Sequence, residues 1–185
     1  MADLSGVLVA AIATHGVEES ELVQPVQALR EAGAEVRVLS RDGRPIQAMN
    51  GMDKTNMIEV DGSVERADAD EFDGLLLPGG AYNADKLRMV ERVREFVRGT
   101  DLRDKPLAVI CHAPWILVST EVVDDRTLTS YYTIQDDVRN AGGNWADKEV
   151  VVDGNLVTSR QPSDIPAFNQ AFMALLAEVP KPARA

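Results

Sequence analysis

The stretch Leu107-Ala-Val-Ile-Cys-His-Ala-Pro-Trp115 carries the clearest structural signal in the chain. Its first four residues are all apolar, which is typical of a short strand buried on both faces. Pro114 then suits the first turn of a helix, where its missing N–H is not needed. The stretch therefore predicts a strand, a tight elbow at Cys111 and a helix, as in an α/β fold.

The same alternation extends over the rest of the sequence. Buried strands are predicted at Gly6–Ala13, Ala34–Leu39 and Asp73–Leu77, and helices at Glu19–Ala32, Met89–Arg98, Ala113–Thr120, Gln135–Ala141 and Ile165–Leu176. Strands that alternate with helices are joined by right-handed crossovers. The chain is therefore expected to form a mostly parallel sheet with helices on both faces.

Two hairpins interrupt this rhythm. Arg44–Val60 contains short strand-like pieces around Asn50-Gly51, and we expect this hairpin at the edge of the sheet. Glu149–Val152 and Leu156–Ser159 flank Asp153-Gly154, which is a strong turn signal. Both hairpins are compatible with a single α/β domain.

Length and composition fit one globular domain. The 185 residues are 45% hydrophobic and 26% charged, with no repeat or linker, so we expect one domain over residues 1–180 and a frayed tail at 181–185. The 19 Lys and Arg against 30 Asp and Glu give a net charge of −11. Such a chain repels phosphate backbones and anionic membranes, so neither nucleic acid nor membrane is an expected partner.

The single cysteine also limits the chemistry. It excludes a disulfide within the chain, and Met1–Ser5 lacks the basic residues of a signal peptide, so we expect a cytoplasmic protein. Two histidines and one cysteine lack the spacing of a metal site. We therefore expect neither a metal nor a cofactor.

Cys111 is the candidate nucleophile. Ligands and catalytic groups gather at the carboxyl ends of the strands in such folds, and Cys111 follows a strand there. Backbone N–H groups at the start of the following helix are expected to lower the pKa of the thiol and to stabilise an oxyanion. The alternative is a structural thiol buried in the core.

Other polar groups are expected at the same edge. His112 either acts as a base or contributes its backbone N–H, and His15 follows the first strand. Glu18 lies in the loop after that strand, where a carboxyl group could donate a hydrogen bond or move a proton. Gly79 and Gly80, in the turn after Leu77, allow the backbone to approach a reacting group closely. Each of these residues also has an ordinary structural interpretation as a loop or turn residue.

Four motifs in order resemble the PfpI-like family of the class I glutamine amidotransferase-like superfamily. They are Glu18-Glu-Ser-Glu21, Leu77-Pro-Gly-Gly80, Ala108-Val-Ile-Cys-His-Ala-Pro114 and Val150-Val-Val-Asp-Gly-Asn-Leu-Val-Thr-Ser-Arg160. The resemblance runs from about Val7 to Leu176. It implies a flavodoxin-like three-layer sandwich with a nucleophile elbow.

The resemblance also implies roles for particular residues. Cys111 matches the nucleophile of the family, and His112 matches the histidine that follows it. Glu18 matches the glutamate that hydrogen-bonds the thiol, and Gly80 matches an oxyanion donor. Tyr131 matches a tyrosine near the site.

Family members are often dimers or trimers of dimers, which implies a homo-oligomer with the site near the interface. An acidic residue just past Pro-Gly-Gly then reaches the histidine of a neighbouring subunit, and Asp85 matches that position. The loop that holds Asp85 is about one residue longer than usual, and aspartate is shorter than the glutamate of some members.

The family includes proteins described as intracellular peptidases, protein deglycases and general stress proteins. We therefore expect a cofactor-independent cysteine enzyme that acts on 2-oxoaldehydes or their protein adducts, or on peptides. The alternative is a redox-sensing stress protein or holdase with little turnover. Glutamine amidotransfer is disfavoured, since no histidine follows His112.

Overall fold

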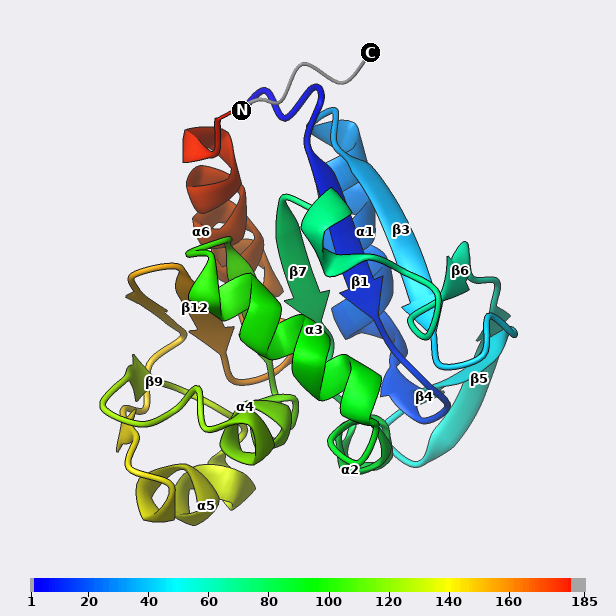
Figure 1. The fold of residues 1–185 in the computed structure, drawn as a ribbon. Helices are drawn as coiled ribbons and strands as arrows, with labels where there is room; N and C mark the ends of the chain where they lie inside the picture. Colours follow the sequence, from blue (N-terminus) through cyan, green and yellow to red (C-terminus); the bar gives the residue numbers. More distant parts are fainter. Residues whose placement is uncertain (1, 181–185) are drawn as a thin grey trace.

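A computed structural model describes residues 2–180, and the tail expected at 181–185 lies outside the described residues. Its centre is a seven-stranded sheet with the order β11-β12-β8-β7-β1-β3-β6 (Figure 1). The strands are β1 (Leu8–Ile12), β3 (Glu35–Ser40), β6 (Gly62–Ser63), β7 (Gly74–Leu77), β8 (Leu107–Ile110), β11 (Val150–Asp153) and β12 (Leu156–Ser159). Neighbouring strands are parallel except β11 and β12, which form the predicted antiparallel hairpin.

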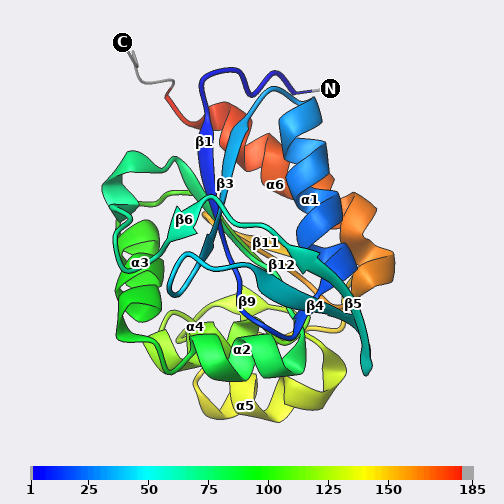
Figure 2. The same cartoon turned by 90° about the vertical axis from the view of Figure 1, so that its right-hand side faces the viewer.

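Helices cover both faces of this sheet (Figure 2). One face packs against α1 (Glu19–Glu31) and α6 (Ile165–Glu178), and the other against α2 (Ala81–Leu87), α3 (Glu91–Leu102), α4 (Pro114–Thr120) and α5 (Gln135–Asn140). The two hydrophobic layers are separate clusters, with Phe168 and Phe172 in the first and Phe96 in the second. The expected mostly parallel three-layer sandwich is confirmed.

The hairpin around Asn50-Gly51 forms, but not at the edge of the main sheet. β4 (Ile46–Asn50) and β5 (Asp53–Ile58) pair with each other, and β4 pairs with β2 (Val17–Glu18) in a separate three-stranded sheet. The expected edge position is therefore wrong. The hairpin instead lies beside the loop that follows β1.

A second difference concerns the segment after Gly80. We expected a loop around Asp85, but residues 81–87 form α2, whose inner side buries Asn83, Ala84 and Leu87. The buried residues recur at helical spacing, which explains why so short and polar a segment is stable as a helix here.

The remaining elements are short. β9 (Thr127–Leu128) pairs with β10 (Asn144–Trp145), and three single turns of 3₁₀ helix are η1 (Ala69–Glu71), η2 (Tyr132–Ile134) and η3 (Pro162–Asp164). Within the described residues, no helix has both the length and the apolar character needed to cross a bilayer.

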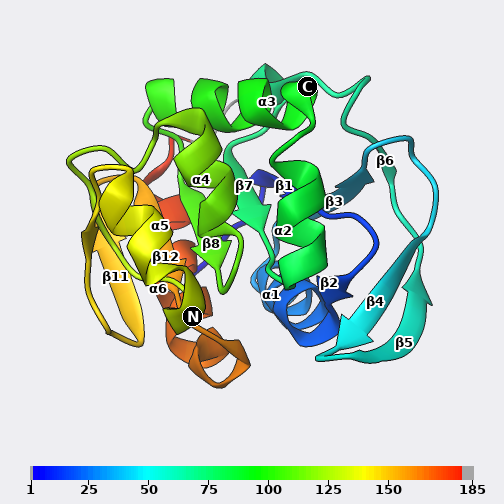
Figure 3. The ribbon, with the colours of Figure 1, turned by 90° about the horizontal axis from the view of Figure 1, so that it is seen from below.

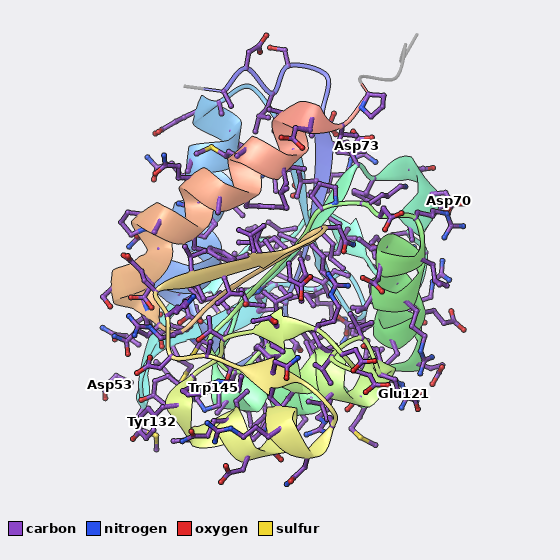
Figure 4. The ribbon with its side chains drawn as sticks, turned by 90° about the vertical axis from the view of Figure 1, so that its left-hand side faces the viewer. Asp53, Asp70, Asp73, Glu121, Tyr132 and Trp145 are labelled. Carbon is purple, nitrogen blue, oxygen red and sulfur yellow. The ribbon has the colours of Figure 1, made fainter. Side chains whose placement is uncertain are left out.

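Figure 3 views the molecule from the side at which β1 and β7 end, with α2 and α4 beside these ends. Asp53, next to the β4–β5 turn, and Tyr132 also lie toward this end of the molecule, whereas Asp70 and Asp73 lie toward the opposite end (Figure 4). The hairpin and the segment before α5 are therefore available to surround a site at the carboxyl edge of the sheet.

Candidate active site

Cys111 lies at the elbow between β8 and α4, as expected. Its backbone is left-handed, with φ of 64°, a conformation that is uncommon for residues other than glycine. The structure holds this strained conformation from both sides: the Cys111 N–H donates to Ser159 O at 3.0 Å, and its carbonyl oxygen accepts from Tyr131 N at 2.7 Å. The residue is only 6% exposed, so the thiol lies at the floor of the site.

The glutamate beside the thiol is Glu21, and the expectation that Glu18 fills this place is wrong. Glu21 is fully buried on the first turn of α1, where Oε2 accepts from the Gly79 N–H at 2.9 Å, and its carboxyl group interacts with the Cys111 thiol. Glu18 instead turns toward the β4–β5 hairpin and accepts from the Gly51 N–H at 3.0 Å. Glu18 is the N-cap residue and has an extended backbone, whereas Glu21 lies within the first turn of α1, so their side chains leave the chain in different directions.

A signal for Glu21 is present in the sequence. The residues of α1 at four-residue spacing, Glu21, Pro25 and Leu29, are all buried on the same face of the helix. A carboxyl group on the apolar stripe of an amphipathic helix indicates a buried acid, which often has a functional role.

Burial controls the protonation of this pair of acids. It raises the pKa of Glu21 to about 8, and the charge of Glu18 adds to the rise. Burial also raises the pKa of the Cys111 thiol, and the charge of Glu21 adds to it, although the N–H groups of Gly80 and His112 both favour the thiolate. The expected lowering of the thiol pKa is therefore wrong, because burial and the neighbouring carboxyl group outweigh the elbow N–H groups. Both shifts favour the protonated forms of Glu21 and Cys111.

His112 faces the sulfur, although it is the next residue along the chain. Its Nδ1 lies 3.2 Å from Cys111 Sγ, and its Nε2 lies 3.3 Å from Thr133 Oγ1. The ring also stacks on Tyr131, with 4.7 Å between the ring centroids. Burial lowers the pKa of His112, so the imidazole is neutral at pH 7 and can accept a proton.

Gly79 and Gly80 bring the turn after β7 close to Cys111 and to the loop after β1. A Cβ atom on Gly79 would lie 2.6 Å from Cys111 Cβ and would also overlap the Glu21 carboxylate. Gly80 has φ of 90°, and a Cβ there would collide with Gly16 O and with Glu18 N. Glycine is therefore required at position 79 for the close approach to Cys111, and at position 80 for the close approach to the loop after β1.

These residues open into a pocket of about 910 Å³. It is lined by His15, Gly16, Glu18, Glu21, Gln47, Met49, Asn50, Gly51, Met52, Lys54, Gly80, Ala81, Tyr82, Cys111, His112, Tyr131 and Pro162. The structure thus brings together Cys111, His112, Gly80 and Tyr131 with the pocket residues His15 and Glu18. Gly79 lies directly behind the thiol.

Two expected site residues have other contacts within one chain. His15 Nδ1 accepts from the Gln47 N–H at 2.9 Å, so this side chain helps to hold the β4 strand beside the pocket. Asp85 does not line the pocket, and its carboxylate pairs with Lys86 at 3.0 Å. A single chain does not test its contact with a neighbouring subunit. Within residues 2–180, no three His, Cys, Asp or Glu side chains gather closely enough to hold a metal ion.

Sequence comparison agrees with this geometry. A match to the DJ-1/PfpI family covers residues 7–175. The chain belongs to the DJ-1/PfpI family. It is 39% identical over 173 residues to general stress protein 18 of Bacillus subtilis, an alignment that covers 92% of this chain and 98% of that protein. It is also 42% identical over 159 residues to deglycase PfpI of Pyrococcus furiosus, covering 86% and 93% of the two chains.

Structural comparison places the chain in the same DJ-1/PfpI family. The crystal structure of Drosophila melanogaster DJ-1beta superposes with a TM-score of 0.85 at 28% sequence identity, covering 93% of this chain and 91% of that chain. The flavodoxin-like α/β fold and the resemblance to PfpI-like proteins are thereby confirmed. At the level of the DJ-1/PfpI family, the names of the relatives indicate stress-related proteins and hydrolases.

Proposed function

We propose that this chain is a cofactor-independent cysteine hydrolase that acts on 2-oxoaldehydes or on their adducts with amines. The observation that carries the proposal is the arrangement around Cys111. A neutral imidazole lies on one side of the thiol, at 3.2 Å, and a buried protonated carboxyl group lies beside it. The name of the deglycase relative supports a carbonyl adduct as the class of substrate.

The first step forms a carbon–sulfur bond. Because burial keeps the Cys111 thiol protonated, a base has to remove its proton as sulfur attacks the aldehyde carbon. His112 Nδ1 is placed to take that proton. The N–H groups of Gly80 and His112 both point at the sulfur, so they can stabilise the oxygen anion that forms on the adjacent carbon. Protonation of this anion gives a hemithioacetal. With a hemiaminal adduct, sulfur replaces the amine at the same carbon: the C–N bond breaks, the amine leaves with the proton that His112 took from the thiol, and the same hemithioacetal results.

The second step is an internal oxidation and reduction without a cofactor. A base removes the proton from the former aldehyde carbon, and the neighbouring keto carbon receives a proton, so that the hemithioacetal becomes a 2-hydroxy thioester. Glu21 supplies a proton on one side of the site, and His112 carries one on the other. Water then hydrolyses the thioester, which releases the hydroxy acid and restores the Cys111 thiol.

The size of the pocket favours an adduct over the free aldehyde. Pockets that enclose ligands of drug size have volumes of roughly 300–1,000 Å³, and the pocket above Cys111 lies near the upper end of this range at about 910 Å³. A three-carbon aldehyde would fill only a small part of it. An amino-acid side chain that carries the aldehyde would fill more, with its peptide backbone at the pocket mouth.

A role as a redox sensor is less well supported by the same geometry. Oxidation of cysteine is favoured by exposure and by thiolate character. Cys111 is 6% exposed, and burial raises its pKa. Peptide hydrolysis uses the same nucleophile, but it requires His112 to protonate a leaving amine.

The test is release of lactate from methylglyoxal by the purified protein and by Cys111→Ala. We expect turnover by the wild-type protein only, and equal rates with the two proteins would refute the proposal. A series with increasing N-acetyl-lysine at constant total methylglyoxal identifies the substrate. A rate that follows the adduct supports deglycation, whereas a rate that follows the free aldehyde indicates glyoxalase-like activity.

A further inference from the structure

One wall of the pocket is the small sheet of β2, β4 and β5, and three of its residues lie in one row across the strands. Glu18 of β2 pairs in register with Met49 of β4, and Met49 pairs with Lys54 of β5. Residues paired on neighbouring strands project from the same face of a sheet. All three side chains line the pocket, so this wall presents a carboxylate, a thioether and an ammonium group in that order.

The opposite face of the same sheet belongs to the hydrophobic core. Val17 and Ala48 precede Glu18 and Met49, pair with each other and are fully buried. Because side chains alternate between the two faces of a strand, burial of this pair directs Glu18 and Met49 toward the pocket. The order of the row is set by backbone pairing within one chain, so it is the same whether or not a second copy covers the pocket mouth.

The row has an inner and an outer end. At the inner end, the Glu18 N–H donates to Gly79 O at 3.3 Å, and Gly79 lies directly behind the thiol. Figure 3 shows β2, β4 and β5 in this order, with β5 on the outside. Neighbouring strands lie about 4.8 Å apart, so the backbone of Lys54 lies about 10 Å from that of Glu18, farther from the nucleophile.

The two charged ends can each bind a group of opposite charge. Glu18 Oε2 accepts from the Gly51 N–H at 3.0 Å, which holds the carboxylate in place, and a carboxylate has lone pairs enough for a second donor. Of the described residues that line the pocket, Lys54 is the only lysine or arginine. A ligand that matches the row therefore has a cation near the reacting carbon, an apolar stem, and an anion at its far end.

Arginine with a free carboxylate has these three parts in this order. Its guanidinium stays charged, its methylene stem can pack on the adaptable Met49 thioether, and its α-carboxylate then lies toward Lys54. An arginine inside a polypeptide has the first two parts but lacks the carboxylate. The row thus distinguishes arginine that is free, or that ends a chain, from arginine within one.

We propose that Glu18, Met49 and Lys54 form a subsite that selects carbonyl adducts of arginine with a free α-carboxylate. The inference rests on the proposed function, because the adduct contains the carbon that Cys111 attacks. In the exchange step sulfur bonds to this carbon, the bond from the carbon to the guanidinium nitrogen breaks, and that nitrogen receives the thiol proton through His112. Arginine then leaves along the row.

Binding of the released amine tests the Lys54 end without turnover. Nα-acetylarginine and its amide differ only in the carboxylate, and NMR titration of the purified protein in its own oligomeric state gives both Kd values. Salt at about 0.15 M screens the long-range attraction of the acidic protein for the more cationic amide. We expect a Kd about 5-fold lower for the acid, as for one partly exposed ion pair.

Two variants show whether this preference comes from Lys54. Lys54→Met removes the charge and keeps an unbranched side chain, so the ratio of the two Kd values should fall to about 1. Lys148→Met is the matched control, because it removes an exposed lysine that does not line the pocket, and it should keep the wild-type ratio. Equal Kd values for the acid and the amide in the wild-type protein would overturn the inference.

The Glu18 end is tested with Nα-acetylcitrulline, in which a neutral urea replaces the guanidinium. Its Kd should be about 5-fold higher than that of Nα-acetylarginine in the wild-type protein, and the difference should disappear in Glu18→Gln. A difference that persists in Glu18→Gln would contradict the role of this carboxylate.

Free arginine and the last residue of a peptide present the same chemistry, and Nα-acetylalanyl-arginine separates them. Tighter binding of this dipeptide than of arginine indicates chain ends as the source, and tighter binding of arginine indicates the free amino acid; either result supports the subsite. Failure of the proposed function is recognised separately, as absence of Cys111-dependent turnover of the arginine adduct while the Kd ratios hold.

Discussion

At the scale of single residues, Glu21 and Cys111 act as one unit because each lies in the field of the other. Ionising either acid is opposed by burial, and ionising both would place two negative charges together. In the proposed mechanism, His112 therefore has to remove the thiol proton as sulfur attacks the substrate carbon.

The first prediction concerns the pH dependence of stability. The pKa of Glu21 is about 8 in the folded protein, against an ordinary value of 4.5. The folded state thus holds an extra proton between these values, so the contribution to the free energy of unfolding is full below pH 4.5 and is lost as pH rises toward 8. The loss should amount to several kcal/mol, at about 1.4 kcal/mol per pKa unit.

Urea denaturation of the wild-type protein and Glu21→Gln at pH 5 and pH 8.5 measures this effect. We expect the variant to lose less stability than the wild-type protein over this interval. Glu31→Gln changes an exposed glutamate of the same helix and should behave like the wild-type protein. Parallel pH dependence in Glu21→Gln and the wild-type protein would show that Glu21 is not buried in its neutral form.

A second prediction at this scale tests the close approach at Gly79. Gly79→Ala would push a methyl group against Cys111 Cβ at 2.6 Å and Ile110 O at 2.9 Å, so we expect loss of activity and a destabilisation of about 1–3 kcal/mol. Gly99→Ala is the matched control. Gly99 lies within α3 and a Cβ there meets only the end of Arg103, so the substitution should stabilise the helix by up to about 1 kcal/mol. Normal activity in Gly79→Ala would contradict the packing behind the thiol.

The residues of the site differ in how far the sequence identifies them. Cys111 can be predicted because a strand and a helix flank it directly. Glu21 can be identified only if the buried face of α1 is known, because residues 18–21 contain three glutamates and the sequence alone does not show which of them lies beside the thiol. Thr133 is brought to His112 only by tertiary structure.

At the scale of elements, the site depends on how α2 is joined to the ends of β1 and β7. Asn83 makes this connection from within the helix and is fully buried. Its Oδ1 accepts from Thr14 N at 2.7 Å, and its Nδ2 donates to Pro78 O at 2.9 Å and to Gly79 O at 3.0 Å. One side chain thus ties the loop after β1 to the Pro-Gly-Gly turn beside the thiol.

Asn83→Ala should therefore lower both stability and activity. Removing the side chain leaves the partly buried Thr14 N–H and the buried Pro78 carbonyl group without this partner, while Gly79 O still accepts from the Glu18 N–H, and the cost is roughly 2–4 kcal/mol in total. Asn56→Ala removes an exposed asparagine whose Nδ2 donates to Glu19 Oε1, and should change stability by less than about 1 kcal/mol. The two variants are compared by their thermal unfolding and by their kcat/KM. Equal effects in both would show that Asn83 does not hold the turn.

Most elements can be predicted from local sequence. The two that differ from expectation, the helix α2 and the position of the β4–β5 hairpin, differ for the same reason. Strands such as Leu107–Ile110 are continuous apolar runs, which periodicity detects. In contrast, α2 is stabilised by packing of three buried residues, and β4 pairs with the two residues of β2. Such contacts between distant short segments have no local pattern, so they become visible only in the folded chain.

At the scale of the whole molecule, the rim of the pocket is unusually apolar for an acidic protein. Met52 at the β4–β5 turn is 93% exposed, Tyr82 on α2 is 58% exposed, and Tyr132 on η2 is 61% exposed. Met52 and Tyr82 line the pocket, and the Tyr132 ring lies 4.9 Å from that of Tyr131, which also lines it. Exposed apolar side chains grouped at a pocket mouth are typical of a surface that another molecule covers.

We therefore expect a homodimer or larger homo-oligomer in which a second copy covers part of this rim and brings Asp85 toward His112. Light scattering should give at least twice the mass of one chain, and Met52→Lys with Tyr132→Lys should shift the mass toward the monomer. Asp85→Asn tests the contact itself. If Asp85 reaches His112 across subunits, Asp85→Asn should lower kcat in the assembled protein without changing its mass. In a background that carries Met52→Lys and Tyr132→Lys, the proteins with Asp85 and with Asp85→Asn should have the same kcat. A strict monomer with full activity would rule out the contact.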